Sequence, residues 1–372
     1  MMTIVFSLCV LLSVYAFVLY PALLFVLSRR PRPTAARDDH LPPVSVLVPV
    51  YNEEATVEAK LQNCLELDYP ADRLEIVFAS DGSTDRTASI LRSRADPRVR
   101  VIECPQNRGK TAVLAETIPQ LKGEVVVLTD ATGMLNAAAI RKMVRHFADP
   151  EVGGVCGFYR ILREGRTRLD SAESSYHGVE MLLRFWEGRI RTTLSGTGAL
   201  CAIRKADYRP LPPHIINEDY VLTSRIALSG KRVVYDPAAQ IADRLSTSPA
   251  HVFRRRVRIA YGNWQQVVHL KALLNPARGY LSWIFYSHKL LRMLMPLVLI
   301  LLVASSLGLP QAVWAPVVAG LGALAVLGLA GLVLDRVMKD ANPLSVVVLV
   351  FLNFAAVIVG TFKYLAGRPV KW

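Results

Sequence analysis

Long apolar stretches lie near both ends of the chain, and a region of mixed hydrophobic and polar residues separates them. Four stretches are about as long as the roughly 20 apolar residues that a helix needs to cross a bilayer core. They run from about Thr3 to Leu27, Leu290 to Leu309, Val313 to Leu334 and Leu344 to Phe362. The first has no basic region before it and no clear small-residue cleavage site, and it continues to Arg29, so we predict a retained anchor over 1–28. The others predict about three transmembrane helices within 290–372.

In the mixed region, short β-rich apolar runs alternate with segments of helical spacing. A proline-rich, charged segment at 29–43 is typical of a linker. The predicted strands are Val44–Val48, Glu75–Ala79, Val99–Ile102 and Glu124–Thr129, and the predicted helices between them cover 54–67, 84–94 and 110–121. Strands that alternate with helices in this way indicate a mostly parallel sheet with helices on both faces, and hence an α/β domain, which we place at 44–250.

The alternation becomes less regular beyond Gly153 and Gly154. Helical spacing predicts helices at 138–147, 171–191 and 219–228, and β-rich runs predict strands at 198–203 and 232–235. A basic helix with interleaved apolar residues is expected at 251–274, and it suits a membrane surface. We therefore assign 251–289 to basic interfacial helices.

Composition favours a membrane protein with one globular domain, because 52% of the residues are hydrophobic. The formal net charge is +14, and the basic residues cluster beside the apolar stretches. The clusters are Arg29, Arg30, Arg32; Arg254, Arg255, Arg256, Arg258; and Lys289, Arg292. By the positive-inside rule, this pattern predicts that residues 29–289 lie in the cytoplasm. The membrane is then expected to be the plasma membrane, which in a bacterium is the inner membrane. The five scattered cysteines, with no CxxC, fit reduced thiols there.

The charges at the C-terminal end leave two topologies open. Three further spans after a cytoplasmic domain would place the C-terminus outside, whereas Lys363, Arg368 and Lys371 favour the cytoplasm. Either the first span dominates the orientation, or one C-terminal segment lies in the interface plane without crossing.

Polar residues follow three of the predicted strands. They are Pro49 to Glu54, Ser80 to Asp85 and Asp130 to Thr132. In open parallel sheets, ligands bind at the carboxyl ends of the strands. Any one of these motifs could be a plain turn with a helix cap, but three acidic strand ends in one sheet favour a binding site.

The chain has no Walker-type loop and no GxGxxG after its first strand, so a bound nucleotide would need side chains and a metal. Asp81 can accept a hydrogen bond from a base N–H, and Tyr51 can stack on a ring. Asp130 can hold a divalent cation that neutralises a diphosphate. Thr132 points to the same side as Asp130, although a neutral hydroxyl is a poorer ligand for Mg²⁺ than a carboxylate.

A second acidic feature, Asn217-Glu218-Asp219, interrupts an otherwise apolar segment bounded by prolines. Buried carboxylates are costly unless something opposes their charge. Glu218 and Asp219 are therefore either the solvated start of a helix or a working acid or base, and a helix N-terminus would favour the ionised form.

The ordered set of motifs resembles the family 2 inverting glycosyltransferases with a GT-A fold, especially the membrane-embedded synthases of hyaluronan, cellulose and other exopolysaccharides. The motifs are Val48-Pro-Val-Tyr-Asn-Glu53, Asp81-Gly-Ser-Thr-Asp85, Arg108-Gly-Lys110, Asp130-Ala-Thr132, Ser195-Gly-Thr-Gly-Ala-Leu200 and Glu218-Asp219, followed by a basic segment and apolar spans. The resemblance covers residues 44 to about 265.

The resemblance implies a role for each matching residue. Pro49, Tyr51, Glu53 and Asp81 would hold the uridine of a UDP-sugar, with Lys110 supporting that pocket. Asp130, with a weaker contribution from Thr132, would bind Mg²⁺ or Mn²⁺ on the diphosphate. Asp219 would be the general base, Glu218 would orient it or contact the acceptor, Gly196-Thr197-Gly198 would face the acceptor sugar, and Arg255 and Arg258 would meet the leaving diphosphate.

Two positions depart from the family pattern. Thr132 replaces the second acidic residue of the metal motif, and Ile259 stands where a tryptophan is expected after Arg258. Trp264 is too far along to fill that place without a shift. Residues 254–258 are equally well interpreted as a membrane-surface helix face. The glutamates at 173, 180 and 187 are spaced by seven and predict a solvated helix face.

We therefore expect a membrane enzyme that transfers a hexose or N-acetylhexosamine from a UDP-sugar to a growing polysaccharide with inversion. The alternative is a single addition to a lipid or lipid-linked acceptor, which four spans and Ile259 favour. The lipid bilayer is an expected partner, and the resemblance leaves room for a homo-oligomer or an export partner. A scaffold or nucleic-acid binder would explain the positive charge, but acidic strand ends would repel a phosphate backbone unless they held metal, so we expect no nucleic acid.

Overall fold

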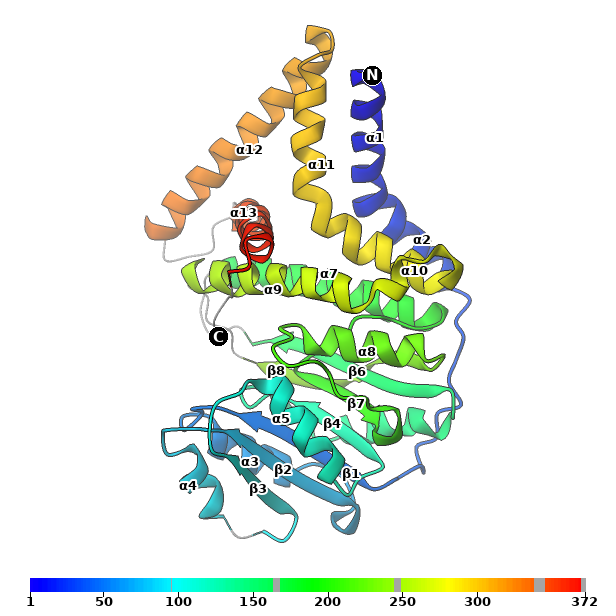
Figure 1. The fold of residues 1–372 in the computed structure, drawn as a ribbon, viewed down its shortest axis with the longest axis vertical. Coiled ribbons are helices and arrows are strands. Elements are labelled where there is room, and N and C mark those ends of the chain that lie inside the picture. The colour runs from blue at the N-terminus through cyan, green and yellow to red at the C-terminus, as the bar shows by residue number, and fades with distance from the viewer. Residues whose placement is uncertain (95, 163–167, 244–248, 338–344, 369–372) are drawn as a thin grey trace. The chain divides into compact units, whose positions relative to one another are not determined.

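The computed structural model describes residues 1–94, 96–162, 168–243, 249–337 and 345–368 (Figure 1). Contacts divide the chain into two compact units. The sheet unit contains 28–162 and 181–245, and the helical unit contains 1–27, 163–180 and 246–372. Lys371, one of the charges in the topology prediction, lies outside the described residues.

The described part of the sheet unit is organised around one eight-stranded sheet of order β3-β2-β1-β4-β7-β6-β8-β5. The strands are β1 (Val44–Val50), β2 (Leu74–Asp81), β3 (Val99–Cys104), β4 (Val125–Thr129), β5 (Met134–Leu135), β6 (Val152–Ile161), β7 (Leu200–Arg204) and β8 (Arg232–Asp243). Among these strands, four neighbouring pairs are parallel and three are antiparallel. The sheet is therefore mixed, and the predicted mostly parallel pairing holds best for its first half.

That first half, β3-β2-β1-β4, is parallel throughout. Its strands are joined through α3 (Val57–Leu65), α4 (Thr87–Arg92) and α5 (Lys110–Thr117). Val46, Val48, Ile76, Phe78 and Val126 are fully buried. Burying each such side chain stabilises the fold by about 1.5–3 kcal/mol, which explains why continuous apolar runs predict these strands well.

The second half of the sheet contains a strand that the sequence pattern did not predict. β6 begins beside Gly153 and Gly154, residues that are poor strand formers. It pairs with β7 antiparallel and with β8 parallel, with an irregular register at Gly157. A Cβ at Gly157 would lie 2.4 Å from Leu200 Cδ2, so β6 can pass β7 there only with glycine. These glycines weaken the local strand signal while permitting the packing.

The remaining helices follow the predicted segments with shifted ends. They are α6 (Ala139–Val144), α7 (Arg168–Ile190), α8 (Glu218–Leu228) and α9 (Pro249–His269). β8 is longer than its predicted four residues because it continues through Pro237 to Asp243, pairing with β6 and β5.

In the helical unit, four described helices are long and apolar enough to cross a membrane. They cover Met2–Leu27, Tyr280–Ser306, Gln311–Gly331 and Val347–Leu365. The first is built from α1 (Met2–Val14), a π-helical segment (Tyr15–Leu19) and α2 (Tyr20–Leu27). The second is built from α10 (Tyr280–Ile284), a π-helical segment (Phe285–Leu290) and α11 (Leu291–Ser306). α12 (Gln311–Val337) and α13 (Ser345–Leu365) complete the unit.

The helix α9 packs against α13 at close range. A Cβ on Gly360 would lie 2.6 Å from Ala260 Cβ, so glycine permits the approach. Trp264 Nε1 donates to Thr361 Oγ1 at 2.9 Å, and its ring stacks on Tyr364 with centroids 6.1 Å apart. Trp264 is thus engaged in helix packing.

The two π-helical segments meet through polar and aromatic side chains. Tyr15 Oη and Ser287 Oγ are 2.7 Å apart, and Trp283 Nε1 donates to Tyr15 Oη at 2.9 Å. Nearby, His288 Nε2 lies 2.9 Å from Glu180 Oε2, and Arg292 also pairs with Glu180.

These contacts correct the prediction of a solvated glutamate face. Only 13% of the Glu180 side chain is exposed. Glu187 is buried and accepts a hydrogen bond from Thr193 Oγ1 at 2.7 Å. The side chain at 173 is outside the described part. Spacing along one helix could not reveal the partners that these carboxylates meet from other segments.

Candidate active site

The acidic pair after β7 stands at the start of a helix. α8 begins at Glu218, with Asn217 as the preceding residue and both acidic residues in the first turn. Glu218 is buried, whereas Asp219 is partly exposed. The segment before the helix is fastened to α5, because Thr111 Oγ1 donates to the Ile215 carbonyl at 3.0 Å. The pair thus starts a helix as predicted, but Glu218 is buried there and not solvated. A role as acid or base stays a prediction.

A single ammonium group connects three of the predicted motifs. Lys110 Nζ lies 2.8 Å from Asp130 Oδ1 and 2.8 Å from Glu218 Oε1. It also donates to the Gly198 carbonyl at 3.4 Å. Lys110 is thus located between Asp130 at the end of β4 and the start of α8. The backbone N–H groups of Arg108 and Gly109, which precede Lys110, donate to Asp81.

Charge and burial oppose each other in this cluster. Burial alone would lower the pKa of Lys110, but Asp130 and Glu218 outweigh it and raise that pKa. Burial raises the pKa of Glu218, and Lys110 opposes the shift only in part, while Asp219 adds to it. Lys110 therefore remains a cation against two carboxylates.

Two glycines allow the loop after α7 to approach Asp219. A Cβ on Gly198 would lie 3.3 Å from Asp219 Oδ2, and one on Gly196 would lie 2.7 Å from the Asp219 carbonyl oxygen. Thr197 faces the interior instead, where its Oγ1 lies 2.8 Å from Tyr235 Oη. The backbone at Gly196 and Gly198 therefore lies against Asp219, while the side chain of Thr197 anchors the loop.

At the end of β2, Asp81 organises the loop that precedes α5. Its Oδ1 accepts from the Arg108 N–H at 2.9 Å, and its Oδ2 accepts from the Gly109 N–H at 2.7 Å. Gly82 has φ +68°, and a Cβ there would lie 2.6 Å from Asn107 N. Asp81 thus holds two strand-end loops together.

The loop after β1 is fixed to the same region. Asn52, with φ 54°, donates its N–H to Ser83 Oγ at 3.2 Å, and its side chain accepts from the Thr84 N–H at 2.8 Å. The Glu53 carboxylate accepts from Thr56 Oγ1 at 2.6 Å. Tyr51 is 47% exposed, so its ring is available for stacking, and Pro49 is half-buried within β1.

The chemistry of the donor set at the end of β4 fits a hard divalent cation. Asp130 offers a carboxylate that is 41% exposed, and Thr132 offers an exposed hydroxyl two residues on. In the described part of the chain, no three His, Cys, Asp or Glu side chains gather as a ready-made metal site. Mg²⁺ and similar ions are commonly held by one or two carboxylates together with substrate phosphates, which is compatible with this arrangement.

Arg255 and Arg258 lie on α9, in the helical unit. Both are partly exposed. Their contact with a diphosphate stays a prediction, as does the alternative of a membrane-surface face.

Two functional candidates were missed by sequence reasoning. Lys60 is fully buried on the apolar face of α3, and Asp243 is buried at the end of β8. The signal for Lys60 was present, since it falls between Val57 and Leu61 on the apolar stripe. No local pattern distinguishes Asp243.

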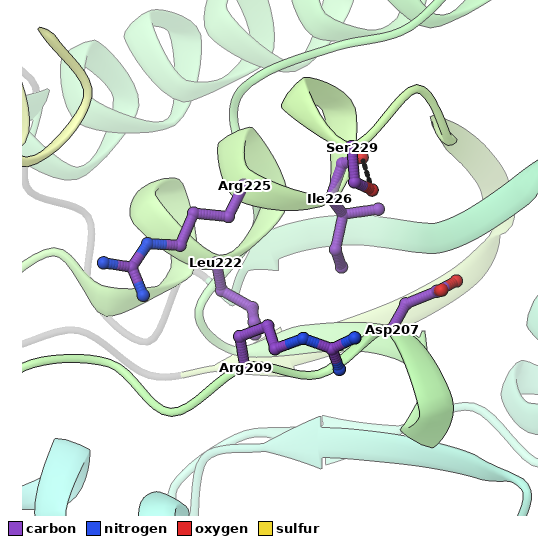
Figure 2. A pocket seen from close by; sticks show the side chains of 6 residues that line it. All are labelled: Asp207, Arg209, Leu222, Arg225, Ile226 and Ser229. Atoms are coloured by element: carbon purple, nitrogen blue, oxygen red, sulfur yellow. Dashed lines mark hydrogen bonds between the residues drawn. The ribbon is translucent and has the colours of Figure 1, made fainter. Parts of the chain in front are cut away.

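A separate small cavity of about 90 Å³ is lined by none of these residues. Figure 2 shows its lining: Asp207, Arg209, Leu222, Arg225, Ile226 and Ser229. The α8 residues in this lining come from later turns than Glu218 and Asp219. The cavity is therefore distinct from the cluster around Lys110.

Comparison with known proteins identifies the domain. Residues 45–206 match the model of Glycosyl transferase family 2. The chain is 31% identical to Probable glycosyltransferase YdaM of Bacillus subtilis, over 63% of this chain and 57% of that protein. It is 27% identical to a poly-beta-1,6-N-acetyl-D-glucosamine synthase of Staphylococcus aureus, over 60% of this chain and 55% of the synthase. The chain thus spans little more than half the length of these curated relatives.

A solved structure extends the similarity to the whole fold. The mannosyltransferase PcManGT from Pyrobaculum calidifontis, solved with GDP-Man and Mn²⁺, superposes with a TM-score of 0.76. The superposition covers 98% of this chain and 100% of that one at 24% identity. Together with the motifs around Lys110, these similarities show a glycosyl transferase family 2 domain at residues 45–206 and a fold of the GT-A type.

Proposed function

We propose that the protein is a membrane-bound inverting glycosyltransferase that transfers a sugar from a UDP-sugar to a growing polysaccharide. The observation that carries the proposal is the cluster at Lys110. One ammonium contacts Asp130, Glu218 and the Gly198 carbonyl, and Gly198 borders Asp219. Residues proposed for the donor, the acceptor and the base thus meet at one point.

The proposed reaction is a direct displacement at the anomeric carbon. An acceptor hydroxyl oxygen attacks this carbon, the bond to the diphosphate oxygen breaks, and UDP leaves with the bonding electrons. Asp219 takes the proton of the attacking hydroxyl, and Glu218 fixes the position of Lys110 beside it. Attack from the face opposite the leaving group inverts the configuration.

The nucleotide would bind over the loops that Asp81 holds together. Tyr51 would stack on the uracil, with Glu53 and Pro49 beside it, and Asp81 would accept from the base N–H. Asp130 and Thr132 would hold a divalent cation, which neutralises charge on the diphosphate as it leaves. The neighbouring PcManGT structure contains Mn²⁺, which supports Mn²⁺ as the first ion to test.

A lipid or lipid-linked acceptor that receives a single sugar is the second candidate. Trp264 supports it, because this side chain packs on Thr361 and Tyr364 in the helical unit and so does not replace the tryptophan absent at Ile259. We place the catalytic domain in the cytoplasm and the apolar helices in the plasma membrane, as the basic clusters favour.

The test is a nucleotide-sugar panel with the full-length protein in membranes and Mn²⁺, assayed for nucleotide release and product length. UDP-hexoses and UDP-N-acetylhexosamines are the expected donors, and GDP-mannose is included because PcManGT binds it. A polymer supports the synthase, whereas one added sugar on an extracted lipid supports the second candidate. If no donor is turned over, or if Asp219→Asn keeps full activity, the proposed function or its base is wrong.

A further inference from the structure

The buried carboxylate of Asp243 lies directly beside Thr132, the position at which the metal motif lacks its second acidic residue. Thr132 Oγ1 donates to Asp243 Oδ2 at 3.1 Å. Tyr159 Oη donates to the same oxygen at 2.9 Å. Asp243 is only 6% exposed, whereas Thr132 is exposed. A carboxylate 111 residues away in the sequence therefore holds the hydroxyl that replaces the second acidic residue.

The backbone fixes this proximity. β5 pairs antiparallel with β8, with Met134 opposite Ala242. A Cβ on Gly133 would lie 2.4 Å from Ile241 Cδ1, so the 130–133 segment lies directly against the end of β8. The Asp243 carbonyl also accepts from the Leu162 N–H at 2.8 Å, which ties this end to β6.

The buried side chain of Lys60 also holds this segment in place. Lys60 Nζ donates to Thr129 Oγ1 at 2.9 Å and to the Gly133 carbonyl at 2.5 Å, so it holds both ends of 130–132. Burial lowers the pKa of Lys60, while the charges of Asp130 and Asp243 act on it in the opposite direction. Both carboxylates are therefore close enough to influence one ammonium.

We propose that Asp243 is a positioning residue for the cation site, supplying through Thr132 the second carboxylate that the motif lacks. This inference rests on the proposed function. An ionised carboxylate can only accept hydrogen bonds, so Thr132 must donate its single hydroxyl hydrogen to Asp243. The remaining lone pairs of Thr132 Oγ1 are then available to a cation beside Asp130, and the nearby negative charge strengthens the hydroxyl as a ligand.

The competing explanation is that Asp243 only neutralises Lys60. The two roles differ in what they affect. A purely structural carboxylate would change stability and nucleotide affinity with or without metal, whereas a positioning carboxylate would change the gain in affinity that metal provides.

The test measures the metal coupling of nucleotide binding. The Kd of UDP is determined by calorimetry for the full-length protein in detergent, once with Mn²⁺ and once with EDTA. The coupling is the Kd in EDTA divided by the Kd in Mn²⁺. We expect Asp243→Asn to reduce this ratio about 10–100-fold, the usual cost of losing a residue that orients a metal ligand, while the Kd in EDTA stays within about threefold. Thr132→Val should reduce the ratio comparably.

Two further variants separate a positioning role from a structural one. Thr132→Asp in the Asp243→Asn background restores a carboxylate at the motif itself, and it should recover most of the coupling. Asp236→Asn is the matched control, because Asp236 is also a buried carboxylate of β8 but pairs with Arg145 and His146. It should destabilise the protein and leave the coupling unchanged.

Each outcome decides between the hypotheses. Wild-type coupling in Asp243→Asn, or failure of Thr132→Asp to restore a lost coupling, would overturn the role of Asp243 while leaving the proposed function intact. A wild-type protein that binds UDP equally in Mn²⁺ and EDTA would overturn the inference and the metal-assisted step of the proposed function. A wild-type protein that binds no UDP would overturn both.

Discussion

The two halves of the central sheet use side chains differently. In the parallel half, β3-β2-β1-β4, the candidate residues follow strands directly, and backbone N–H groups meet them, as at Asp81. In the mixed half, β7-β6-β8-β5, the carboxylates are buried and paired with side chains from distant segments, as at Asp236 and Asp243. The parallel half is thus suited to holding a ligand at an edge, and the mixed half to fixing the groups that act on it.

This difference teaches where each kind of substitution should act. Changes in the parallel half should alter nucleotide affinity. Changes in the mixed half should alter turnover or stability or, at Asp243, the gain in nucleotide affinity that metal provides.

Asp219→Asn should have the largest effect. Removing a general base typically costs about 10²–10⁴-fold in rate, because the acceptor hydroxyl keeps its proton in the transition state. Nucleotide release under saturating donor measures this loss, and the Kd of UDP should stay near the wild-type value. A large change in UDP affinity with unchanged turnover would reverse the proposed division between the halves.

Asp236→Asn should reduce stability by about 3 kcal/mol at pH 7, because it leaves Arg145 and His146 without their buried carboxylate. Burial alone would raise the pKa of Asp236, but hydrogen bonds from His146 and the Ala238 N–H and the charge of Arg145 lower it overall. A lowered pKa contributes stability that is present above the unfolded value near 3.9 and is lost as pH falls through the folded pKa.

The gap in stability between wild type and Asp236→Asn should therefore be full at pH 7 and shrink below about pH 4. Chemical denaturation at several pH values measures it. A gap that grows on acidification would show that Asp236 is not held as an anion by these partners.

Asp81→Ala should weaken UDP binding about 30-fold, or ~2 kcal/mol, because the Arg108 and Gly109 N–H groups lose their acceptor and the loop loses its order. Turnover at saturating donor should fall less. Asp96→Ala, which removes a carboxylate that pairs with the nearby Arg98, is the matched control and should leave UDP affinity unchanged.

Gly198→Ala should have the smallest effect, about a tenfold loss of turnover, or ~1.4 kcal/mol. The new methyl group would press on the Asp219 carboxylate at 3.3 Å. Gly154→Ala meets Val233 Cγ2 at an ordinary 3.4 Å and serves as the comparison. Equal losses in both variants would indicate a general effect on the sheet instead of displacement of the base.

The parallel half could be predicted from sequence because its information is local. The run Val44–Val48 lies within β1, and Glu124–Thr129 nearly coincides with β4, since strands buried on both faces need uninterrupted apolar residues. The acidic residues that follow such strands are read directly, and the structure joins Asp130 and Glu218 through Lys110.

The mixed half could not be predicted in this way because its determinants are partners distant in sequence. β6 requires glycine at 157 to pass Leu200, a requirement that lowers its own strand propensity. The spacing of Glu187 along α7 predicts a solvated side chain, yet Thr193, beyond the end of the helix, donates a hydrogen bond to it. Asp243 has no local signature at all, because Thr132 and Tyr159 reach it only after β5, β6 and β8 pair.

The π-helical segments of the first two apolar helices place aromatic residues that are five apart in the sequence on the same face. In an α-helix, two residues five apart point about 140° away from each other. Yet Tyr15 and Tyr20 are five apart with rings 6.3 Å from each other, and Trp283 and His288, also five apart, both lie against Tyr20, at 5.4 and 6.1 Å. The extra residue in each turn rotates the following side chains onto the same face. The aromatic residues that join these two helices are therefore spaced by five, a spacing that neither a heptad search nor an α-helical search would detect. Deleting a single residue from one helix would turn its aromatic side chains away from the other helix.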